Sequence, residues 1–168
     1  MGRPQMIQLR PALNTDQDAI CAIWNPIIRN TSITFTPDEK TSADITALIA
    51  KTYAAGDVFL VADDGGHVLG FALTSSFRAG AGYRHVRELT IHLAPEARGQ
   101  GTGRALIEEL IRLSKANATR ALIAGISAEN TAAQAFHARF GFEEFGRLPQ
   151  VCTKFGRALD LVLMQKLL

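Results

Sequence analysis

The stretch Arg98-Gly99-Gln100-Gly101-Thr102-Gly103-Arg104 lies between a segment typical of a strand, which ends near Leu93, and a segment typical of a helix. Its alternating glycines leave backbone N–H groups unobstructed. The first turn of the following helix adds unpaired N–H donors and a dipole that attracts negative charge. The two arginines add positive charge, so the stretch predicts a binding site for phosphate oxygens.

The spacing of this loop separates it from other phosphate-binding loops. No Lys-Thr or Lys-Ser pair follows the glycines, as it does in a P-loop. Gly99, Gly101 and Gly103 also do not satisfy the G-x-G-x-x-G pattern of dinucleotide-binding folds. The spacing therefore disfavours ATP and NAD as ligands. Taken alone, the loop is equally consistent with a flexible turn between a strand and a helix.

The rest of the chain alternates between strand-like and helix-like segments. Apolar residues at helical spacing predict helices, and short apolar or alternating runs predict strands. We expect a strand over Met6–Arg10, a helix from Asn14, an irregular segment over Thr31–Pro37, a helix over Thr41–Ala54, strands over Val58–Ala62 and Val68–Thr74, a strand ending at Leu93, a helix over Gly101–Lys115, a strand over Arg120–Ile126, a helix from Asn130 to about Arg139, and strands over Phe142–Phe145 and Val151–Met164. This order predicts an α/β fold.

Length and composition indicate one globular domain over residues 1–168. The chain has 47% hydrophobic and 20% charged residues, with a formal net charge of +2. The cations are scattered, so nucleic acid is disfavoured as a partner. Cys21 and Cys152 both lie in apolar segments, which gives neither a disulfide framework nor the spacing of a metal site. Because we find no signal core and no long apolar run, we expect a cytoplasmic protein without metal or membrane attachment.

Three motifs in order resemble the GCN5-related N-acetyltransferase (GNAT) superfamily. Arg98-x-x-Gly101-x-Gly103 resembles its acetyl-CoA pyrophosphate loop, and Asn130-x-x-Ala133-x-x-x-His137-x-x-x-Gly141-Phe142 resembles its second cofactor element. Three features resemble the phosphinothricin and methionine sulfoximine acetyltransferase branch: the run from Lys154 to Gln165, Arg78 and Tyr83 before Glu88, and Trp24-Asn25-Pro26 followed by Thr31 and Phe35. The resemblance implies acetyl-CoA as co-substrate, a homodimer, and a mixed, largely antiparallel sheet of about seven strands. Helices flank this sheet, which splays at the acetyl-CoA site.

Two residues are candidates for catalysis. Acetyl transfer needs a neutral amine, so a base must remove a proton from the ammonium form of the acceptor. Glu88 occupies the family's position for this base, although a solvated carboxylate paired with Arg87 or Arg84 is the alternative. By resemblance, His137 is the acid that protonates the leaving thiolate of CoA. Its alternative is a histidine on a helix surface.

The resemblance also implies which residues bind acetyl-CoA. Backbone groups near Ile91, His92 and Leu93 would pair with the pantetheine arm, and their N–H groups could stabilise negative charge on the thioester carbonyl. We expect the His92 side chain to point outward. Asn130 would contact pantetheine while capping a helix. The phosphate loop would supply Arg98, Gly99, Gln100, Gly101, Thr102, Gly103 and Arg104.

The acceptor site departs from the pattern of the branch. Phe35, Arg78, Tyr83 and Lys154 are the candidate contacts, each with an equal alternative in packing or surface charge. Gly80 stands where the branch has a second arginine that would grip a carboxylate or phosphinate, and Val86, Arg87 and Ala158 also depart. Phosphinothricin and methionine sulfoximine are therefore possible acceptors, as are other amino acids and unrelated amines.

Together these features favour an N-acetyltransferase that acts on a small-molecule amine. Because neither cysteine looks like an acyl carrier, direct transfer in a ternary complex is expected. Two alternatives remain. One is an acetyltransferase for proteins or peptides, and the other is a non-catalytic module that senses acetyl-CoA.

Overall fold

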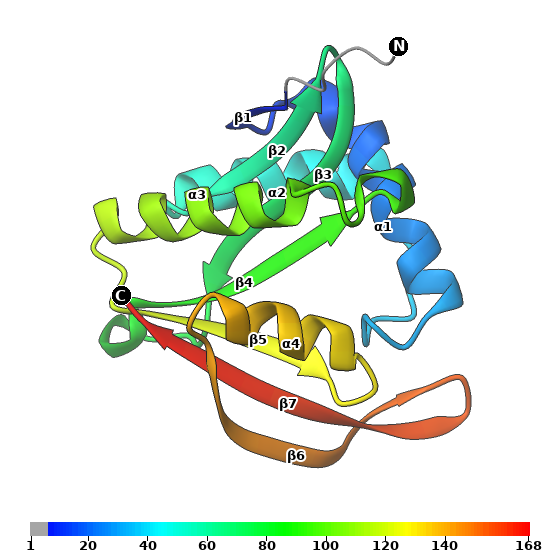
Figure 1. Cartoon of the computed structure of the whole chain (residues 1–168), viewed down its shortest axis with the longest axis vertical. Coiled ribbons are helices and arrows are strands. Elements are labelled where there is room, and N and C mark those ends of the chain that lie inside the picture. The colour runs from blue at the N-terminus through cyan, green and yellow to red at the C-terminus, as the bar shows by residue number, and fades with distance from the viewer. Residues whose placement is uncertain (1–6) are drawn as a thin grey trace.

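The computed structural model describes residues 7–168, which form one mixed sheet of seven strands (Figure 1). The strand order is β1-β2-β3-β4-β5-β7-β6, and all neighbours are antiparallel except β4 and β5. The strands are β1 (Gln8–Pro11), β2 (Phe59–Asp64), β3 (His67–Ser76), β4 (Val86–Leu93), β5 (Ala121–Ser127), β6 (Glu143–Lys154) and β7 (Arg157–Leu167). The predicted α/β class and strand number are confirmed. Met6, the expected start of the first strand, lies outside the described residues.

Helices cover both faces of the sheet, and alternate residues of each strand face them. The helices are α1 (Gln17–Asn30), α2 (Ser42–Ala54), α3 (Thr102–Ala116) and α4 (Thr131–Arg139). On β2, Leu60 belongs to the apolar core that includes Leu106 of α3, whereas Phe59 belongs to the core that includes Ile23 of α1 and Ile49 of α2. Figure 1 shows α3 and α4 on the same side of the sheet. No helix in the part of the chain that the structure describes is long and apolar enough to cross a membrane.

Local sequence signals explain where the helices begin. The side chain of Thr41 accepts a hydrogen bond from the Asp44 N–H and completes a capping box at α2. The expected helix at Asn14 starts instead as a 3-10 turn over Asn14–Asp16, and α1 follows it. Gly101 is the N-cap of α3, with a φ of 85° that only glycine adopts readily. The predicted start of this helix is therefore confirmed to within one residue.

The end of the chain differs from the single long strand expected over Val151–Met164. Two antiparallel strands, β6 and β7, meet at a tight turn formed by Phe155 and Gly156. Both turn residues have positive φ, 53° for Phe155 and 71° for Gly156. A bulky residue rarely adopts this conformation, so Phe155 gives no turn signal in the sequence.

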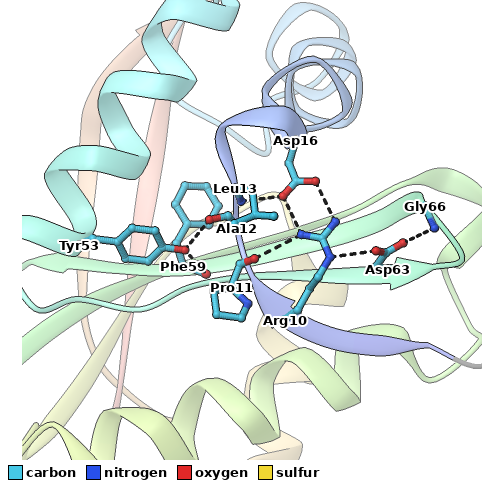
Figure 2. A network of polar contacts seen from close by, with 9 residues as sticks. All are labelled: Arg10, Pro11, Ala12, Leu13, Asp16, Tyr53, Phe59, Asp63 and Gly66. Carbon is cyan, nitrogen blue, oxygen red and sulfur yellow. Dashed lines mark hydrogen bonds and ion pairs between the residues drawn. The ribbon is translucent and has the colours of Figure 1, made fainter.

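A polar network anchors the N-terminal edge of the sheet (Figure 2). The guanidinium of Arg10 on β1 donates to both carboxylate oxygens of Asp16, at 2.8 and 2.9 Å, and to Asp63 on β2 at 2.9 Å. Asp16 also accepts the Leu13 N–H at 2.7 Å. The hydroxyl of Tyr53 on α2 donates to the Ala12 carbonyl at 2.7 Å. These bonds join β1, the 3-10 turn, β2 and α2.

The parallel strands β4 and β5 separate after a short paired region. Their register contains only the pairs Val86–Ala121, Arg87–Leu122 and Glu88–Ile123. Beyond Glu88 the strands diverge, as Figure 1 shows. Each strand remains bonded on its other side, β4 to β3 and β5 to β7. The expected splay in the sheet is thus present.

Candidate active site

Two cavities lie where β4 and β5 diverge, and together they form the candidate site. The smaller has a volume of about 330 Å³ and the larger about 840 Å³. Both are bounded by β4 and α4. The residues that line both cavities are Ile33, Ile91, His92, Asn130, Ala133 and His137. A ligand in the larger cavity can therefore present a reactive group to one in the smaller.

The larger cavity contains the glycine loop and the N-terminus of α3. Gly99 and Gly101 have φ values of 72° and 85°, and no side chain caps the helix. A Cβ at Gly103 would lie 3.2 Å from a methyl group of Leu93, so glycine also permits close packing of helix and strand. Unpaired N–H donors without side chains over them suit phosphate oxygens.

The residues around this loop fit a polyanion such as the pyrophosphate of CoA. Arg98 and Arg104 line the cavity, and Arg104 also pairs with Glu108 at 3.0 Å. Two residues of the expected set do not line it: Gln100 is exposed, and Thr102 is fully buried with no hydrogen-bond partner for its hydroxyl.

Asn130 has the capping role that the sequence predicts. Its side-chain oxygen accepts the Ala133 N–H at 3.1 Å and so caps α4. This bond fixes the side chain at the border between the two cavities. The amide nitrogen of the side chain remains as a second polar group there.

Glu88 is the last residue of β4 that pairs with β5, and it lines the smaller cavity. Burial raises the pKa of its carboxyl group above the usual value. Arg87, one alternative partner, instead forms an ion pair with the buried Asp57 at 3.1 Å and donates to Ser76 at 3.0 Å. Gly125 on β5 leaves room for the carboxylate, since a Cβ there would lie 3.1 Å from Glu88 Oε1.

His137 is a buried residue of α4 that lines both cavities. Its Nδ1 lies 2.8 Å from the Ala133 carbonyl oxygen, which can only accept, so Nδ1 carries the proton. Burial lowers the pKa of His137, although the bond to Ala133 opposes this. The ring is therefore neutral near pH 7, and its buried, unpartnered Nε2 is a hydrogen-bond acceptor.

His92 does not point outward into solvent as expected. Its ring packs against those of Trp24 and Phe71, each with a centroid distance of 5.6 Å. Burial, together with the nearby charge of Arg98, lowers the pKa of His92 to about 4. Side chains alternate between the faces of a strand, and His92 lies on the same face as its pairing partner Phe71, which packs in the core with α1. His92 is thus a neutral part of the wall of both cavities.

The structure brings only one of the four candidate acceptor contacts into the smaller cavity. Phe35 lines it, whereas Arg78, Tyr83 and Lys154 line neither cavity. Arg78 lies over the Phe77 ring at 5.4 Å, and Tyr83 is 47% exposed. Among the described residues, no lysine or arginine lines the smaller cavity.

Several residues of the smaller cavity have no site role that the sequence predicts. Trp24 and Ser127 each place a buried polar atom without a partner at this site, the indole Nε1 and the hydroxyl oxygen. Trp24 fits the apolar face of its helix, and Ser127 ends an apolar strand, so both read as structural residues. The sequence does not identify Gly125 as a site residue either, because glycine occurs within strands for several structural reasons. Among residues 7–168, no group of three potential metal ligands occurs.

Comparison with known proteins points to one family. The sequence model of the acetyltransferase (GNAT) family matches residues 24–142. The phosphinothricin N-acetyltransferase of Alcaligenes faecalis is 37% identical over 94% of this chain and 81% of that protein.

Solved structures share the fold closely. A GNAT superfamily phosphinothricin acetyltransferase from Sinorhizobium meliloti, in complex with acetyl-CoA, has a TM-score of 0.91 and 34% identity, covering 96% of this chain and 88% of that chain. A ribosomal-protein-alanine N-acetyltransferase from Brucella melitensis has a TM-score of 0.93 and 40% identity, covering 96% and 99%. The two names differ in the class of acceptor, so the acceptor has to be argued from the cavity.

Proposed function

Because this chain belongs to the GNAT family of acetyltransferases and is an acetyl-CoA-dependent N-acetyltransferase, we propose that it acetylates the amine of a small amino acid or amino-acid analogue by direct transfer in a ternary complex. One observation carries the proposal. The half-buried carboxylate of Glu88 lies in a small cavity that shares a wall with the cavity of the glycine loop. Acceptor and donor can therefore meet without an acyl-enzyme.

The larger cavity holds acetyl-CoA in this proposal. The N–H groups at the start of α3, together with Arg98, bind its pyrophosphate, and the free edge of β4 over Ile91–Leu93 pairs with its pantetheine arm. Bound there, acetyl-CoA supplies an acetyl group activated as a thioester. The N–H groups of this edge stabilise the negative charge that develops on the carbonyl oxygen.

Glu88 acts as the base. Its raised pKa brings it closer to the pKa of an ammonium group, which favours proton transfer from the acceptor. The carboxylate also attracts the cationic form of the amine into the cavity. After one proton passes to Glu88, the neutral nitrogen can attack the thioester.

His137 relays the second proton. A neutral ring with an unprotonated Nε2 is not a ready acid, so it first accepts the proton that the amine nitrogen loses as the new C–N bond forms. Nε2 then returns this proton to the sulfur as the C–S bond breaks. The balance is one amide, one thiol and one proton left on Glu88. This sequence replaces the simple acid role expected from the resemblance.

The size of the smaller cavity favours a small acceptor over a peptide. Its volume of about 330 Å³ suits an amino acid, and residues of α1, of the segment 33–36 and of β5 border it. Among the described residues, no lysine or arginine lines the cavity, so a cation that binds an acceptor carboxylate would have to come from outside its lining. Arg78 is our candidate for this role. The alternative is a protein acceptor, the class in the name of the Brucella melitensis neighbour.

We include a homodimer and a cytoplasmic location in the proposal. β6 is an edge strand and exposes Phe145, Leu148 and Val151, each between 44% and 51% accessible. Large apolar side chains on a sheet edge favour association with a second copy. Both cysteines are free, as expected in a reducing compartment.

Release of free CoA from acetyl-CoA tests this function. The acceptors are methionine sulfoximine, methionine sulfone, phosphinothricin, the proteinogenic amino acids, and peptides with free N-termini. We expect selective turnover of one or a few amino acids, and a loss of about 100-fold or more in kcat/KM for Glu88→Gln. Glu143→Gln, on the exposed face of β6, is the matched control. Turnover of the peptides alone would exclude the amino-acid proposal.

The pH dependence of kcat/KM is a second test of Glu88 as the base. Glu88 must be deprotonated to accept a proton, so kcat/KM should rise with pH through its raised pKa. In Glu88→Gln this limb should disappear while acetyl-CoA binding persists. An unchanged pH profile in the variant would assign the base to another group.

A further inference from the structure

Lys154, the last residue of β6, carries a buried ammonium group that has no carboxylate partner. The residue is 4% exposed, and none of the ion pairs among the described residues includes it. Nζ donates to the carbonyl oxygens of Thr31 at 2.8 Å and Thr34 at 2.7 Å, and it lies 3.4 Å from the Thr34 hydroxyl. The Phe155 ring lies 5.0 Å away.

These contacts hold the ammonium group against the backbone of the loop after α1. An ammonium group has three N–H donors, and three oxygen atoms surround this one. Lys154 also lines neither cavity, so its ammonium group is not placed to bind a carboxylate or phosphinate of an acceptor. A buried charge without a counter-ion is costly, so its bonds to the two carbonyls must be strong to compensate.

The segment that Lys154 holds is a wall of the acceptor cavity. Residues 33–36 line the smaller cavity, and they have no helix or strand structure of their own. Besides Lys154, the Cys152 thiol contacts the Phe35 carbonyl at 3.6 Å. Ser32 donates to Glu129 at 2.5 Å, and Glu129 pairs with Arg157. The hairpin of β6 and β7 therefore anchors this wall at both ends.

We propose that Lys154 is a positioning residue, which fixes residues 31–36 as a wall of the acceptor cavity and does not itself bind the acceptor. The proposal rests on the proposed function of this cavity and revises the acceptor contact expected from the sequence. Lys154 connects the C-terminal hairpin to the loop after α1, two segments more than 100 residues apart in the sequence. Without this ammonium group, the Phe35 side chain would lose its fixed place.

Kinetics with two acceptors distinguish positioning from direct binding. The best amino-acid acceptor of the wild-type protein is compared with its methyl ester, which lacks the carboxylate. For Lys154→Met we expect KM for both to rise by the same factor, roughly tenfold to 100-fold, with KM for acetyl-CoA unchanged. Lys154→Arg, which keeps charge and donors, should recover part of the loss, and Lys115→Met on the exposed surface of α3 is the matched control.

Hydrogen exchange tests the wall directly and does not depend on turnover. Amides of residues 31–36 should exchange about tenfold faster in Lys154→Met than in the wild-type protein or Lys115→Met. Lys154→Gln, which keeps two N–H donors, replaces the methionine variant if that variant does not fold. This measurement decides the role of Lys154 even if the wild-type protein acetylates none of the amines, which would contradict only the proposed function.

Two results would overturn the inference. A loss confined to the acceptor with a free carboxylate would show that Lys154 binds that group. Unchanged exchange of residues 31–36 in a folded Lys154→Met or Lys154→Gln protein would show that the wall does not depend on it.

Discussion

The absence of a side chain at Gly125 determines where the carboxylate of Glu88, the proposed base, can lie. A Cβ at this position would be 3.1 Å from Glu88 Oε1 and 3.5 Å from a methyl group of Leu161. Contact at 3.1 Å is too tight, so the carboxylate would have to move by a few tenths of an ångström. The base and the amine nitrogen need accurate alignment, which makes such a small shift matter for rate.

Gly125→Ala should therefore lower kcat by about tenfold while leaving KM for acetyl-CoA unchanged. Gly146→Ala is the control, since a Cβ at Gly146 meets no atom within 4 Å. Steady-state kinetics on both variants make the comparison. Equal kcat values for the two variants would mean that the carboxylate tolerates the methyl group.

At the same scale, the sequence predicts some site residues and misses others. Glu88, His137 and the glycines are predictable because they occur at fixed spacings in contiguous motifs. Trp24 and Ser127 are not, because each comes from a separate element and only the folded chain brings them together. The protonated nitrogen of His137 also depends on a carbonyl one turn away, which a residue pattern does not report.

The loop before α3 has its shape because Gly101 adopts a left-handed backbone. Its φ is 85°, and a Cβ there would meet no atom within 4 Å, so only backbone strain opposes an alanine. Such strain costs about 1–2 kcal/mol. Gly101→Ala should relieve it by moving the loop, which raises KM for acetyl-CoA. Gly56→Ala, with a φ of 71° and equally open space, should lose similar stability without this kinetic effect.

Thermal unfolding and acetyl-CoA titration of the two variants separate these effects. If Gly101→Ala and Gly56→Ala raise KM for acetyl-CoA equally, binding of acetyl-CoA does not depend on the loop conformation that Gly101 sets.

Among the elements, the sequence predicts those with strong local signals. Asp63-Asp64-Gly65-Gly66 marks the turn between β2 and β3, and Asn130 marks the start of α4. The turn between β6 and β7 is missed because Phe155 adopts a conformation that its chemistry disfavours. Cross-strand pairing and the contacts of the hairpin with the loop after α1 stabilise it, and these contacts are distant in the sequence.

At the scale of the whole molecule, the network around Arg10 couples stability to pH. Burial raises the pKa of Asp16, but hydrogen bonds from Arg10 and the Leu13 N–H outweigh this, so the pKa lies below its ordinary value of 3.8. A carboxyl group with a lowered pKa stabilises the folded state above the unfolded pKa. This stabilisation is lost as pH falls through the folded pKa.

Asp16→Asn should lower the free energy of unfolding by about 1–3 kcal/mol at pH 7, because it leaves part of the Arg10 guanidinium unpaired. The difference from the wild-type protein should shrink as the pH falls below about 4. Urea unfolding at several pH values measures it, with the exposed Asp38→Asn as control. A difference that stays constant with pH would show that the charge of Asp16 contributes nothing.

The short pairing of β4 with β5 has a consequence for the molecule as a whole. Beyond Glu88, the facing edges of these strands have no strand partner among residues 7–168. An extended arm with amide groups, laid between them, would act as an additional short strand and complete the hydrogen-bond ladder. The co-substrate would then be an architectural component as well as a reagent. The two halves of the sheet, which the chain itself joins at only three residue pairs, would then be linked along the whole splay while acetyl-CoA is bound.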